Sequence, residues 1–246
     1  MLDTPCLLLV GGMGTRLRAV VPQAPKPLAS VGNRSFLELL VRQLQRQGFR
    51  RLLMCTGYLS DLIEREFGDG RAWDISIEYS KEPIPMGTAG AIKLAEAHLG
   101  GARDFLVMNG DSFLEVDLPE LIRFHRDRQA IASIAVVGVE NASRYGTMAV
   151  EPDGRVERFT EKSGSELPGL INGGVYVFNR SALEYFPEGP ASLERDVFPR
   201  LLAHGVYALE QRGMFIDIGT PEDYARAQQI CDRLNEAAES HPQSNL

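Results

Sequence analysis

The sequence predicts an α/β fold in which a mainly parallel, mixed sheet is flanked by helices. Through the first half of the chain, short apolar runs of strand length alternate with stretches of helical periodicity, a pattern typical of βαβ units. Farther on, short strands separated by turn residues such as Pro152-Asp153-Gly154 indicate a hairpin. The 246 residues, 44% hydrophobic and 24% charged, suit a globular protein. We expect a single domain over residues 1–235 and a flexible tail over 236–246.

The first predicted strand, residues 7–10, runs into a glycine-rich turn. The segment from its end onward consists of Val10, Gly11, Gly12, Met13, Gly14, Thr15 and Arg16. Glycine permits positive φ and a close approach to backbone N–H donors, which suit an anion such as a triphosphate. The Arg16 guanidinium matches phosphate oxygens. The spacing fits neither the dinucleotide fingerprint nor the P-loop, and from these residues alone a plain turn with a solvated arginine is an equal alternative.

A lysine held between two prolines follows this turn. Lys26 is flanked by Pro25 and Pro27, and both prolines restrict the backbone around it. A solvated lysine needs no such restraint, whereas a lysine that must meet a phosphate benefits from it. We therefore take Lys26, together with Arg16, as a candidate phosphate-binding and catalytic cation.

Capping signals and apolar runs predict the remaining elements. The residues expected to cap helices are Ser35, Ser60, Asp117 and Thr220, and Gly48 is expected to end the helix that Ser35 begins. Further strands are expected over residues 51–56, 75–79, 105–109, 131–139, 156–160 and 175–178, a further helix over 89–99, and a closing helix over 221–235.

The glycine-rich turn and the Pro25-Lys26-Pro27 segment together resemble the signature of the sugar-1-phosphate nucleotidyltransferases. In that family this segment wraps a nucleoside triphosphate, and its arginine and lysine stabilise the phosphates. The likeness continues along nearly the whole chain and implies a Rossmann-like sheet with an inserted sugar-binding β lobe. It implies a nucleotide-binding part over about residues 1–130 and a sugar-binding part over about 131–220.

The resemblance also implies where the nucleobase binds. The loop over residues 81–90 and the start of the following helix hold the base in that family, so Glu82, Gly87 and Thr88 become nucleotide-binding candidates with the glycine-rich turn. A carboxylate only accepts hydrogen bonds, and the guanine edge offers adjacent N–H donors, whereas an amide suits uracil or thymine better. Glu82 thus favours a guanine nucleotide, with a solvated surface charge as the alternative.

Two aspartates are candidate metal ligands. Asp111 lies at the carboxyl end of the predicted strand 105–109, where a carboxylate can coordinate Mg²⁺ beside phosphate oxygens; a turn cap is the alternative. Its Asn-Gly-Asp context resembles the metal-binding Gly-Asp of the family. Asp217 lies in Asp-Ile-Gly-Thr-Pro, which resembles a second family motif, and the helix cap at Thr220 leaves it free to contact the metal. The expected cofactor is therefore Mg²⁺.

The resemblance places the sugar phosphate in the second half of the chain. The family positions that contact the sugar and its phosphate fall on Gly146, Glu161, Lys162, Asn172 and Gly174. Glu161 can accept hydrogen bonds from two sugar hydroxyls, and Lys162 offers a charge to the phosphate. Taken alone, that pair would be an ordinary surface ion pair.

Composition narrows the compartment and the partners. A net charge of −7 argues against a broad nucleic-acid-binding face. Three scattered cysteines without C-x-x-C spacing argue against disulfides or zinc and suit the cytoplasm. We see no apolar run near the length of a membrane span and no leader at the first residues, so we expect neither a membrane partner nor secretion. A homo-oligomer is compatible with the sequence.

The resemblance implies transfer of a nucleotidyl group, guanylyl in our interpretation, from GTP to a sugar 1-phosphate. The motifs are most similar to those of D-glycero-α-D-manno-heptose 1-phosphate guanylyltransferases, which make GDP-heptose for polysaccharide biosynthesis. A mannose-1-phosphate guanylyltransferase and a uridylyltransferase are the alternatives. A catalytically inactive regulatory subunit on the same fold should lose its charged residues first. That alternative is disfavoured because the charged candidates are all present: Arg16, Lys26, Asp111, Lys162 and Asp217.

Overall fold

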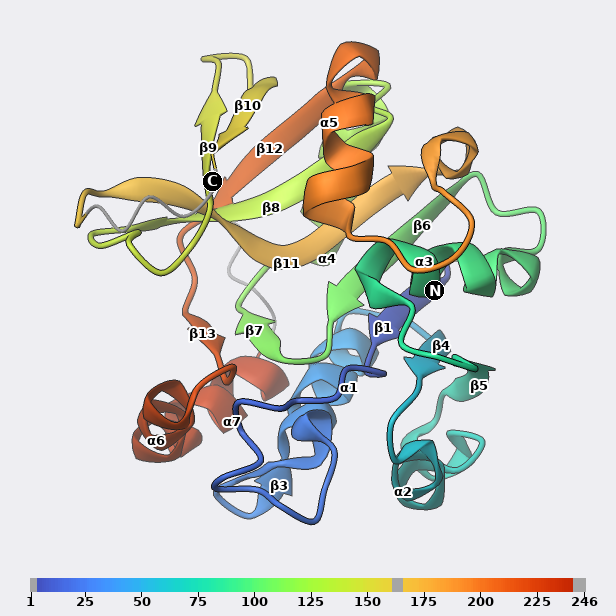
Figure 1. The fold of residues 1–246 in the computed structure, drawn as a ribbon, viewed down its shortest axis with the longest axis vertical. Helices are drawn as coiled ribbons and strands as arrows, with labels where there is room; N and C mark the ends of the chain where they lie inside the picture. Colours follow the sequence, from blue (N-terminus) through green and yellow to red (C-terminus); the bar gives the residue numbers. More distant parts are fainter. Residues whose placement is uncertain (1–3, 161–165, 241–246) are drawn as a thin grey trace.

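The computed structural model describes residues 4–160 and 166–240. A nine-stranded sheet lies at its centre in the order β10-β9-β11-β6-β1-β4-β5, with β8 paired to β11 and β12 paired to β8 (Figure 1). The strands are β1 (Cys6–Leu9), β4 (Arg51–Thr56), β5 (Ser76–Lys81), β6 (Asp104–Asn109), β8 (Ala132–Val139), β9 (Thr147–Val150), β10 (Val156–Thr160), β11 (Gly169–Asn179) and β12 (Val206–Gln211).

The sheet has a parallel part and an antiparallel part. Strands β6, β1, β4 and β5 run parallel to one another, as do β8 and β12. Strand β11 pairs antiparallel with β6, β8 and β9, and β9 with β10 forms the predicted hairpin. Two small sheets pair β2 (Ser30–Val31) with β3 (Arg34–Ser35) and β7 (Ser112–Leu114) with β13 (Phe215–Asp217). The predicted α/β class is confirmed.

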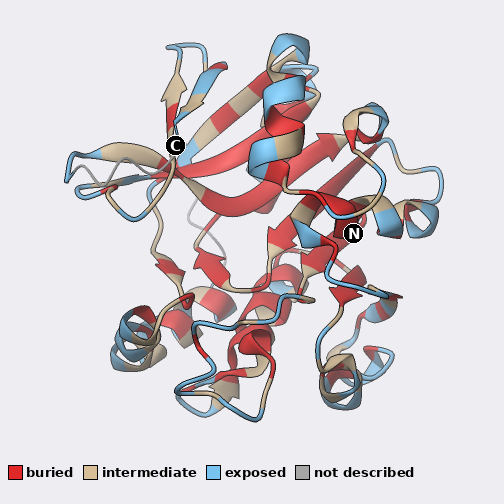
Figure 2. Cartoon of the chain, in the orientation of Figure 1, coloured by how far each residue is buried: buried red, intermediate tan, exposed pale blue. Residues whose placement is uncertain are grey.

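Helices cover both faces of the sheet. They are α1 (Phe36–Arg46), α2 (Ser60–Phe67), α3 (Gly87–Leu94), α4 (Leu118–Asp127), α5 (Phe198–Leu201), α6 (Pro221–Gln229) and α7 (Cys231–Glu239). Alternate residues of β1 pack into different cores: Cys6 and Leu8 join the side chains of α1, α2 and α4, while Leu7 joins those of α3 and α5. This period of two is what a strand buried on both faces requires. Figure 2 shows the central strands buried and the outer faces of α2 and α6 exposed.

Three of the four expected helix caps form as predicted. The side chains of Ser35, Asp117 and Thr220 accept hydrogen bonds from backbone N–H groups three residues later, at 3.2, 2.8 and 3.2 Å. Ser60 was expected to cap α2, but it is the first helical residue. The residue before it, Leu59, has a φ of 55° and makes no side-chain cap. The predicted cap is wrong because Leu59, which precedes Ser60, adopts a left-handed conformation that the sequence pattern does not predict.

The closing helix differs from its expectation. It divides at Ile230 into α6 and α7, and α7 continues through Glu239, so residues 236–239 are helical although they were expected in a flexible tail. The extension is stabilised by burial, because Ala238 is fully buried against α1 and Arg34 pairs with Glu239 at 2.7 Å. Within residues 4–160 and 166–240, no helix has the length and apolar character needed to span a membrane.

Candidate active site

The predicted nucleotide-binding segments meet at the carboxyl edge of the parallel strands. Strands β1, β4, β5 and β6 end at this edge, so the residues that follow them emerge side by side. The backbone N–H of Gly110 donates to Leu9 O at 2.9 Å, and that of Val10 donates to Cys55 O at 2.9 Å. These bonds fix the glycine-rich turn beside the Asn-Gly-Asp segment.

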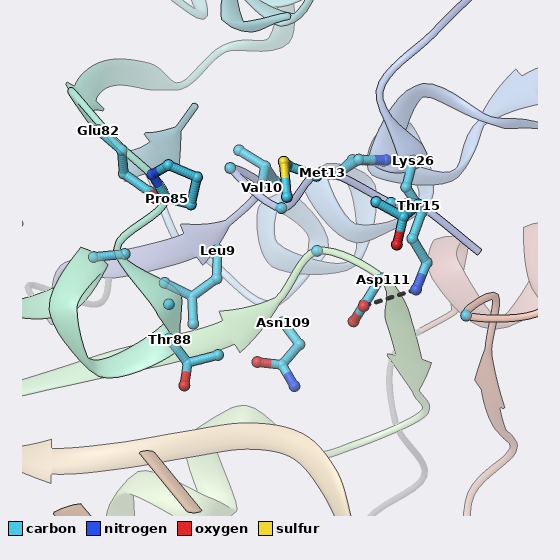
Figure 3. Close-up of a pocket in the computed structure, with 18 of the residues that line it drawn as sticks. Leu9, Val10, Met13, Thr15, Lys26, Glu82, Pro85, Thr88, Asn109 and Asp111 are labelled. Atoms are coloured by element: carbon cyan, nitrogen blue, oxygen red, sulfur yellow. Dashed lines mark hydrogen bonds and ion pairs between the residues drawn. The ribbon is translucent and has the colours of Figure 1, made fainter. Parts of the chain in front are cut away.

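A cavity of about 370 Å³ opens at this edge. Its walls include all of the nucleotide-site candidates and both predicted cations: Val10, Gly11, Gly12, Gly14, Thr15, Arg16, Lys26, Glu82, Gly87, Thr88 and Asp111. Figure 3 shows Glu82 and Thr88 on one side of the cavity and Lys26 with Asp111 on the other. The structure therefore brings together residues that lie far apart in the sequence.

Two glycines of the turn lie close to other segments, and the backbone conformation of one of them, Gly14, favours glycine. Gly14 has a φ of +55°, and a Cβ on it would lie 2.9 Å from Lys26 Cβ, so this glycine lets the turn pack against the proline-flanked lysine. A Cβ on Gly11 would meet Glu82 Oε1, the end of a flexible side chain, and would lie 3.1 Å from the backbone N of Gly57. Gly12 has open space around its Cβ position, and Arg16 is exposed at the mouth of the cavity. The turn thus packs closely against Lys26 and lies beside Glu82, while Arg16 stays accessible.

Lys26 links the two candidate metal ligands. Its Nζ lies 2.8 Å from Asp111 Oδ2 and 3.7 Å from Asp217 Oδ1, and its side chain is only 9% exposed. Asp217 reaches this point because β13 pairs with β7 directly after Asp111, and Ile218 N–H donates to Asp111 O at 3.0 Å. Burial, and then the nearby charge of Asp111, raise the pKa of Asp217, while Lys26 opposes that rise. Both carboxylates therefore lie around the same ammonium group.

This donor set fits a magnesium ion shared with a substrate. The carboxylates of Asp111 and Asp217 keep 44% and 32% of their side-chain surface exposed. Among residues 4–160 and 166–240 no group of three or more His, Cys, Asp or Glu side chains is placed to enclose a metal. Mg²⁺ commonly takes one or two carboxylates and completes its shell with water and phosphate oxygens. Two converging, partly exposed carboxylates provide that partial shell.

The expected base-binding side of the cavity is tightly constrained. Glu82 Oε2 accepts a hydrogen bond from Met86 N–H at 2.8 Å; burial raises the pKa of the Glu82 carboxyl, and this bond lowers it. Gly87 has a φ of +69°, and a Cβ there would lie 2.5 Å from Ala191 O. The Thr88 hydroxyl accepts from Leu193 N–H at 2.8 Å. Thr88 lines the cavity, but its hydroxyl serves the packing of α3 on the segment that precedes α5.

A second, larger cavity of about 840 Å³ adjoins the first. Asn109 and Asp111 line both cavities, and Asp217 lines the second. Of the predicted sugar-site residues, Gly146 and Asn172 also line it. Gly174 does not, but its N–H donates to Asn172 Oδ1 at 2.9 Å and its φ is +76°. Gly174 thus shapes the bulge that presents Asn172. Glu161 and Lys162 lie outside the described residues.

The second cavity also has walls that no sequence motif predicts. They include the aromatic side chains of Tyr145, Phe159 and Phe215 and the charged side chains of Glu194 and Arg195. Tyr145 and Phe215 meet edge to face with ring centroids 6.1 Å apart. Glu194 and Arg195 lie in a short π-helical turn over Leu193–Val197. No motif marked that turn, because only packing against α3 brings it to the cavity.

The fold and the two joined cavities define an α/β protein in which a glycine-rich turn and a pair of carboxylates meet at one site. A family model described as Nucleotidyl transferase matches residues 6–233. The chain belongs to this nucleotidyl transferase family.

Known relatives of the chain include guanylyltransferases. It is 34% identical over 241 residues to the mannose-1-phosphate guanylyltransferase catalytic subunit beta of Xenopus tropicalis, covering 96% of this chain and 66% of that protein. It is 37% identical over 224 residues to a mannose-1-phosphate guanylyltransferase of Mycobacterium tuberculosis, covering 89% and 62%. The chain thus spans about two thirds or less of the length of these relatives.

A solved structure is similar over nearly its whole length. HddC from Yersinia pseudotuberculosis, complexed with GMP-PN, matches with a TM-score of 0.81 and 32% sequence identity. The match covers 92% of this chain and 98% of that one. This similarity agrees with the α/β architecture described above.

Proposed function

We propose that this protein transfers a guanylyl group from GTP to a sugar 1-phosphate and releases pyrophosphate. The observation that carries the proposal is the junction of the two cavities at Asp111, with Lys26 on the nucleotide side and Asp217 on the sugar side. A reaction between two phosphorylated substrates needs both phosphates at one place, and this junction offers charged groups of both signs there.

In the proposed reaction, a phosphate oxygen of the sugar 1-phosphate attacks the α-phosphorus of GTP. A new P–O bond forms, the bond from the α-phosphorus to the bridging oxygen breaks, and the electron pair leaves with pyrophosphate. Two anions must approach, so positioning and charge neutralisation carry most of the catalysis. In this proposal Arg16, which is exposed and lines the first cavity, neutralises the leaving pyrophosphate. Lys26 is held in place for the phosphates at the junction.

Asp111 and Asp217 would hold Mg²⁺ in this proposal. When bound, the ion would neutralise phosphate charge and help orient the α-phosphate. Lys26 holds both carboxylates in position before the substrates arrive, since its ammonium contacts each of them. It thereby reduces the repulsion between two like charges that share one wall.

Guanine is the proposed base because Glu82 lines the first cavity, called the nucleotide cavity below. One carboxylate oxygen of Glu82 accepts from Met86 N–H, and the other lies next to the glycine-rich turn. A guanine base offers a carboxylate two adjacent donors. The printed names of the relatives agree with this choice, since they are guanylyltransferases and the HddC structure contains GMP-PN.

The proposed acceptor is D-glycero-α-D-manno-heptose 1-phosphate, with mannose 1-phosphate as the second candidate. The motif resemblance favours the heptose, and the names of the sequence relatives favour mannose. The second cavity, called the sugar-side cavity below, offers Asn172 for hydroxyl groups, aromatic walls for the ring and Arg195 for the phosphate. These groups suit either sugar.

A pyrophosphate-release assay tests the proposal. GTP, ATP, UTP and CTP are each combined with a panel of sugar 1-phosphates that includes the heptose, mannose and glucose compounds. We expect release with GTP, fastest with the heptose 1-phosphate. Faster release with mannose 1-phosphate would select the alternative acceptor, and a preference for UTP would overturn the guanine assignment. No release with any pair would favour an inactive subunit on the same fold.

A further inference from the structure

The two walls of the sugar-side cavity come from distant parts of the chain. Tyr145 and Gly146 belong to the loop before β9, and Phe215 and Asp217 belong to β13. The shape of the cavity therefore depends on how this loop is held against the segment that joins β13 to α6.

Arg144 connects these two segments. Its Nη1 donates to Asp223 Oδ1 at 3.2 Å, and its Nη2 donates to Asp223 Oδ2 at 2.5 Å and to Thr220 Oγ1 at 3.2 Å. The Asp223 side chain is 5% exposed, whereas that of Arg144 is 51% exposed. This two-pronged geometry matches the fork of a guanidinium to a carboxylate and cannot be reproduced by lysine.

The partners of Arg144 lie next to the candidate metal ligand. Thr220 caps α6 by accepting from Asp223 N–H at 3.2 Å, and its hydroxyl donates to Asp223 Oδ2 at 2.9 Å. Asp217 is three residues before Thr220, and Gly219 N–H donates to its carboxylate. Thr220 and Asp223 therefore fix the start of α6, and with it the short segment that carries Asp217.

The neighbouring residues extend the connection to the cavity itself. Tyr145 follows Arg144 directly, and its ring packs edge to face on Phe215. The aromatic contact alone would leave the loop free to slide along the ring, because such contacts impose little direction. The fork of Arg144 supplies the direction, since three hydrogen bonds to two residues fix both distance and orientation.

We propose that Arg144 is a positioning residue for the sugar 1-phosphate. Its hydrogen bonds to Asp223 and Thr220, called the clasp below, set the separation between the Tyr145-Gly146 wall and the Asp217 wall. The inference rests on the proposed function, because it concerns the acceptor side of that site. Arg144 acts through its neighbours and does not itself line the cavity among the described residues.

Three variants test the clasp: Arg144→Met, Arg144→Lys and Asp223→Asn. For Arg144→Met we expect the KM for the sugar 1-phosphate to rise about tenfold, with the KM for GTP changed less than about twofold. Arg144→Lys should recover only part of the loss, because lysine lacks the fork. The double variant Arg144→Met/Asp223→Asn should be no worse than the poorer single variant, as expected for two residues acting as one unit.

Arg34→Met is the matched control. Arg34 pairs with Glu239 of α7 at 2.7 Å, so this change also removes an ion pair to a closing helix, but Arg34 is absent from the walls of the sugar-side cavity in the described residues. We expect a loss of thermal stability without a change in either KM. If Arg144→Met behaved in the same way, Arg144 would be a structural residue and the positioning role would be overturned.

Calorimetric titration with the sugar 1-phosphate separates this inference from the proposed function. Binding to the wild-type protein without transfer would overturn the transferase proposal, while weaker binding to Arg144→Met would still support the clasp. Transfer by the wild type with unchanged affinity in Arg144→Met would overturn the clasp alone. A wild-type protein that bound no sugar 1-phosphate would overturn both.

Discussion

Lys26 Nζ lies 2.8 Å from Asp111 Oδ2, and the carboxylate of Asp217 lies on the same ammonium group at 3.7 Å. One buried lysine therefore compensates two carboxylates that segments far apart in the sequence bring to the junction of the cavities. The charge balance of this junction depends on all three groups, so changing any one of them should alter both stability and chemistry.

Replacing Lys26 by methionine should leave the two carboxylates facing each other without a cation. We expect the free energy of unfolding to fall by about 1–3 kcal/mol and kcat to fall at least about a hundredfold. Without Lys26, a divalent cation is the remaining way to neutralise the pair. Mg²⁺ should therefore raise the melting temperature of Lys26→Met more than that of the wild type. Equal shifts in a thermal titration with MgCl₂ would contradict the metal-binding role of the carboxylates.

Replacing Asp217 by asparagine should stabilise the metal-free protein while removing activity. The pKa of Asp217 is raised above its ordinary value of 3.8, so the folded state holds the proton more tightly than the unfolded state and ionisation favours unfolding. The wild type thus loses stability as the pH rises from that ordinary value through the raised pKa. The stability that Asp217→Asn gains over the wild type should be absent at pH values well below 3.8 and constant at pH values well above the raised pKa.

Urea unfolding with EDTA at several pH values measures this gain. Asp153→Asn is a suitable control, because Asp153 is exposed in the turn between β9 and β10. Asp217→Asn should also be inactive at pH 7.5 with Mg²⁺ present. A variant less stable than the wild type at pH 7 would show that the attraction to Lys26 exceeds the cost of burying the charge.

Replacing Glu82 by glutamine should weaken the selection of guanine. An amide can still accept from Met86 N–H, so the loop should keep its conformation, but it offers the base one acceptor and one donor in place of two acceptors. We expect kcat/KM for GTP to fall about tenfold or more and the preference for GTP over UTP to narrow. Competition between the two nucleotides in one assay measures this preference directly.

The same variant tests a pH dependence. Burial raises the pKa of Glu82, so protonation should remove its second acceptor at a pH above the ordinary value for a glutamate. GTP affinity of the wild type should therefore decline as the pH falls through that raised pKa. Glu82→Gln cannot titrate and should lack this decline. The same decline in the variant would assign the titration to another group.

The parts of the site that could be predicted from sequence are those that local chemistry specifies. The turn after β1 is marked by its glycines, among which Gly14 adopts a positive φ, and Asp111 is marked by the strand that delivers it. Likewise, the caps at Ser35 and Thr220 are hydrogen bonds within one turn of the chain. Each of these features depends on residues that are close in sequence.

The parts that could not be predicted depend on tertiary packing. Strand β12 pairs with β8 across about seventy residues of chain, and its short, partly apolar sequence gives no local sign of this partner. Arg195 reaches the sugar-side cavity only because the turn over Leu193–Val197 packs on α3. The α7 extension through Glu239 likewise depends on contacts with α1. A polar sequence of this kind is compatible with either a tail or a helix until its partner is known.

Arg195 provides the last prediction, because it lines the sugar-side cavity while its neighbour Arg200 on α5 is exposed and does not. Arg195→Met should raise the KM for a sugar 1-phosphate about tenfold or more by removing the charge that we propose for the acceptor phosphate. The KM for GTP should stay unchanged, since Arg195 is absent from the walls of the nucleotide cavity in the described residues. Arg200→Met removes the same charge from the same segment and should leave both constants unchanged. Equal effects of the two changes would mean that general attraction of the anionic substrate, and not contact in the cavity, explains the role of Arg195.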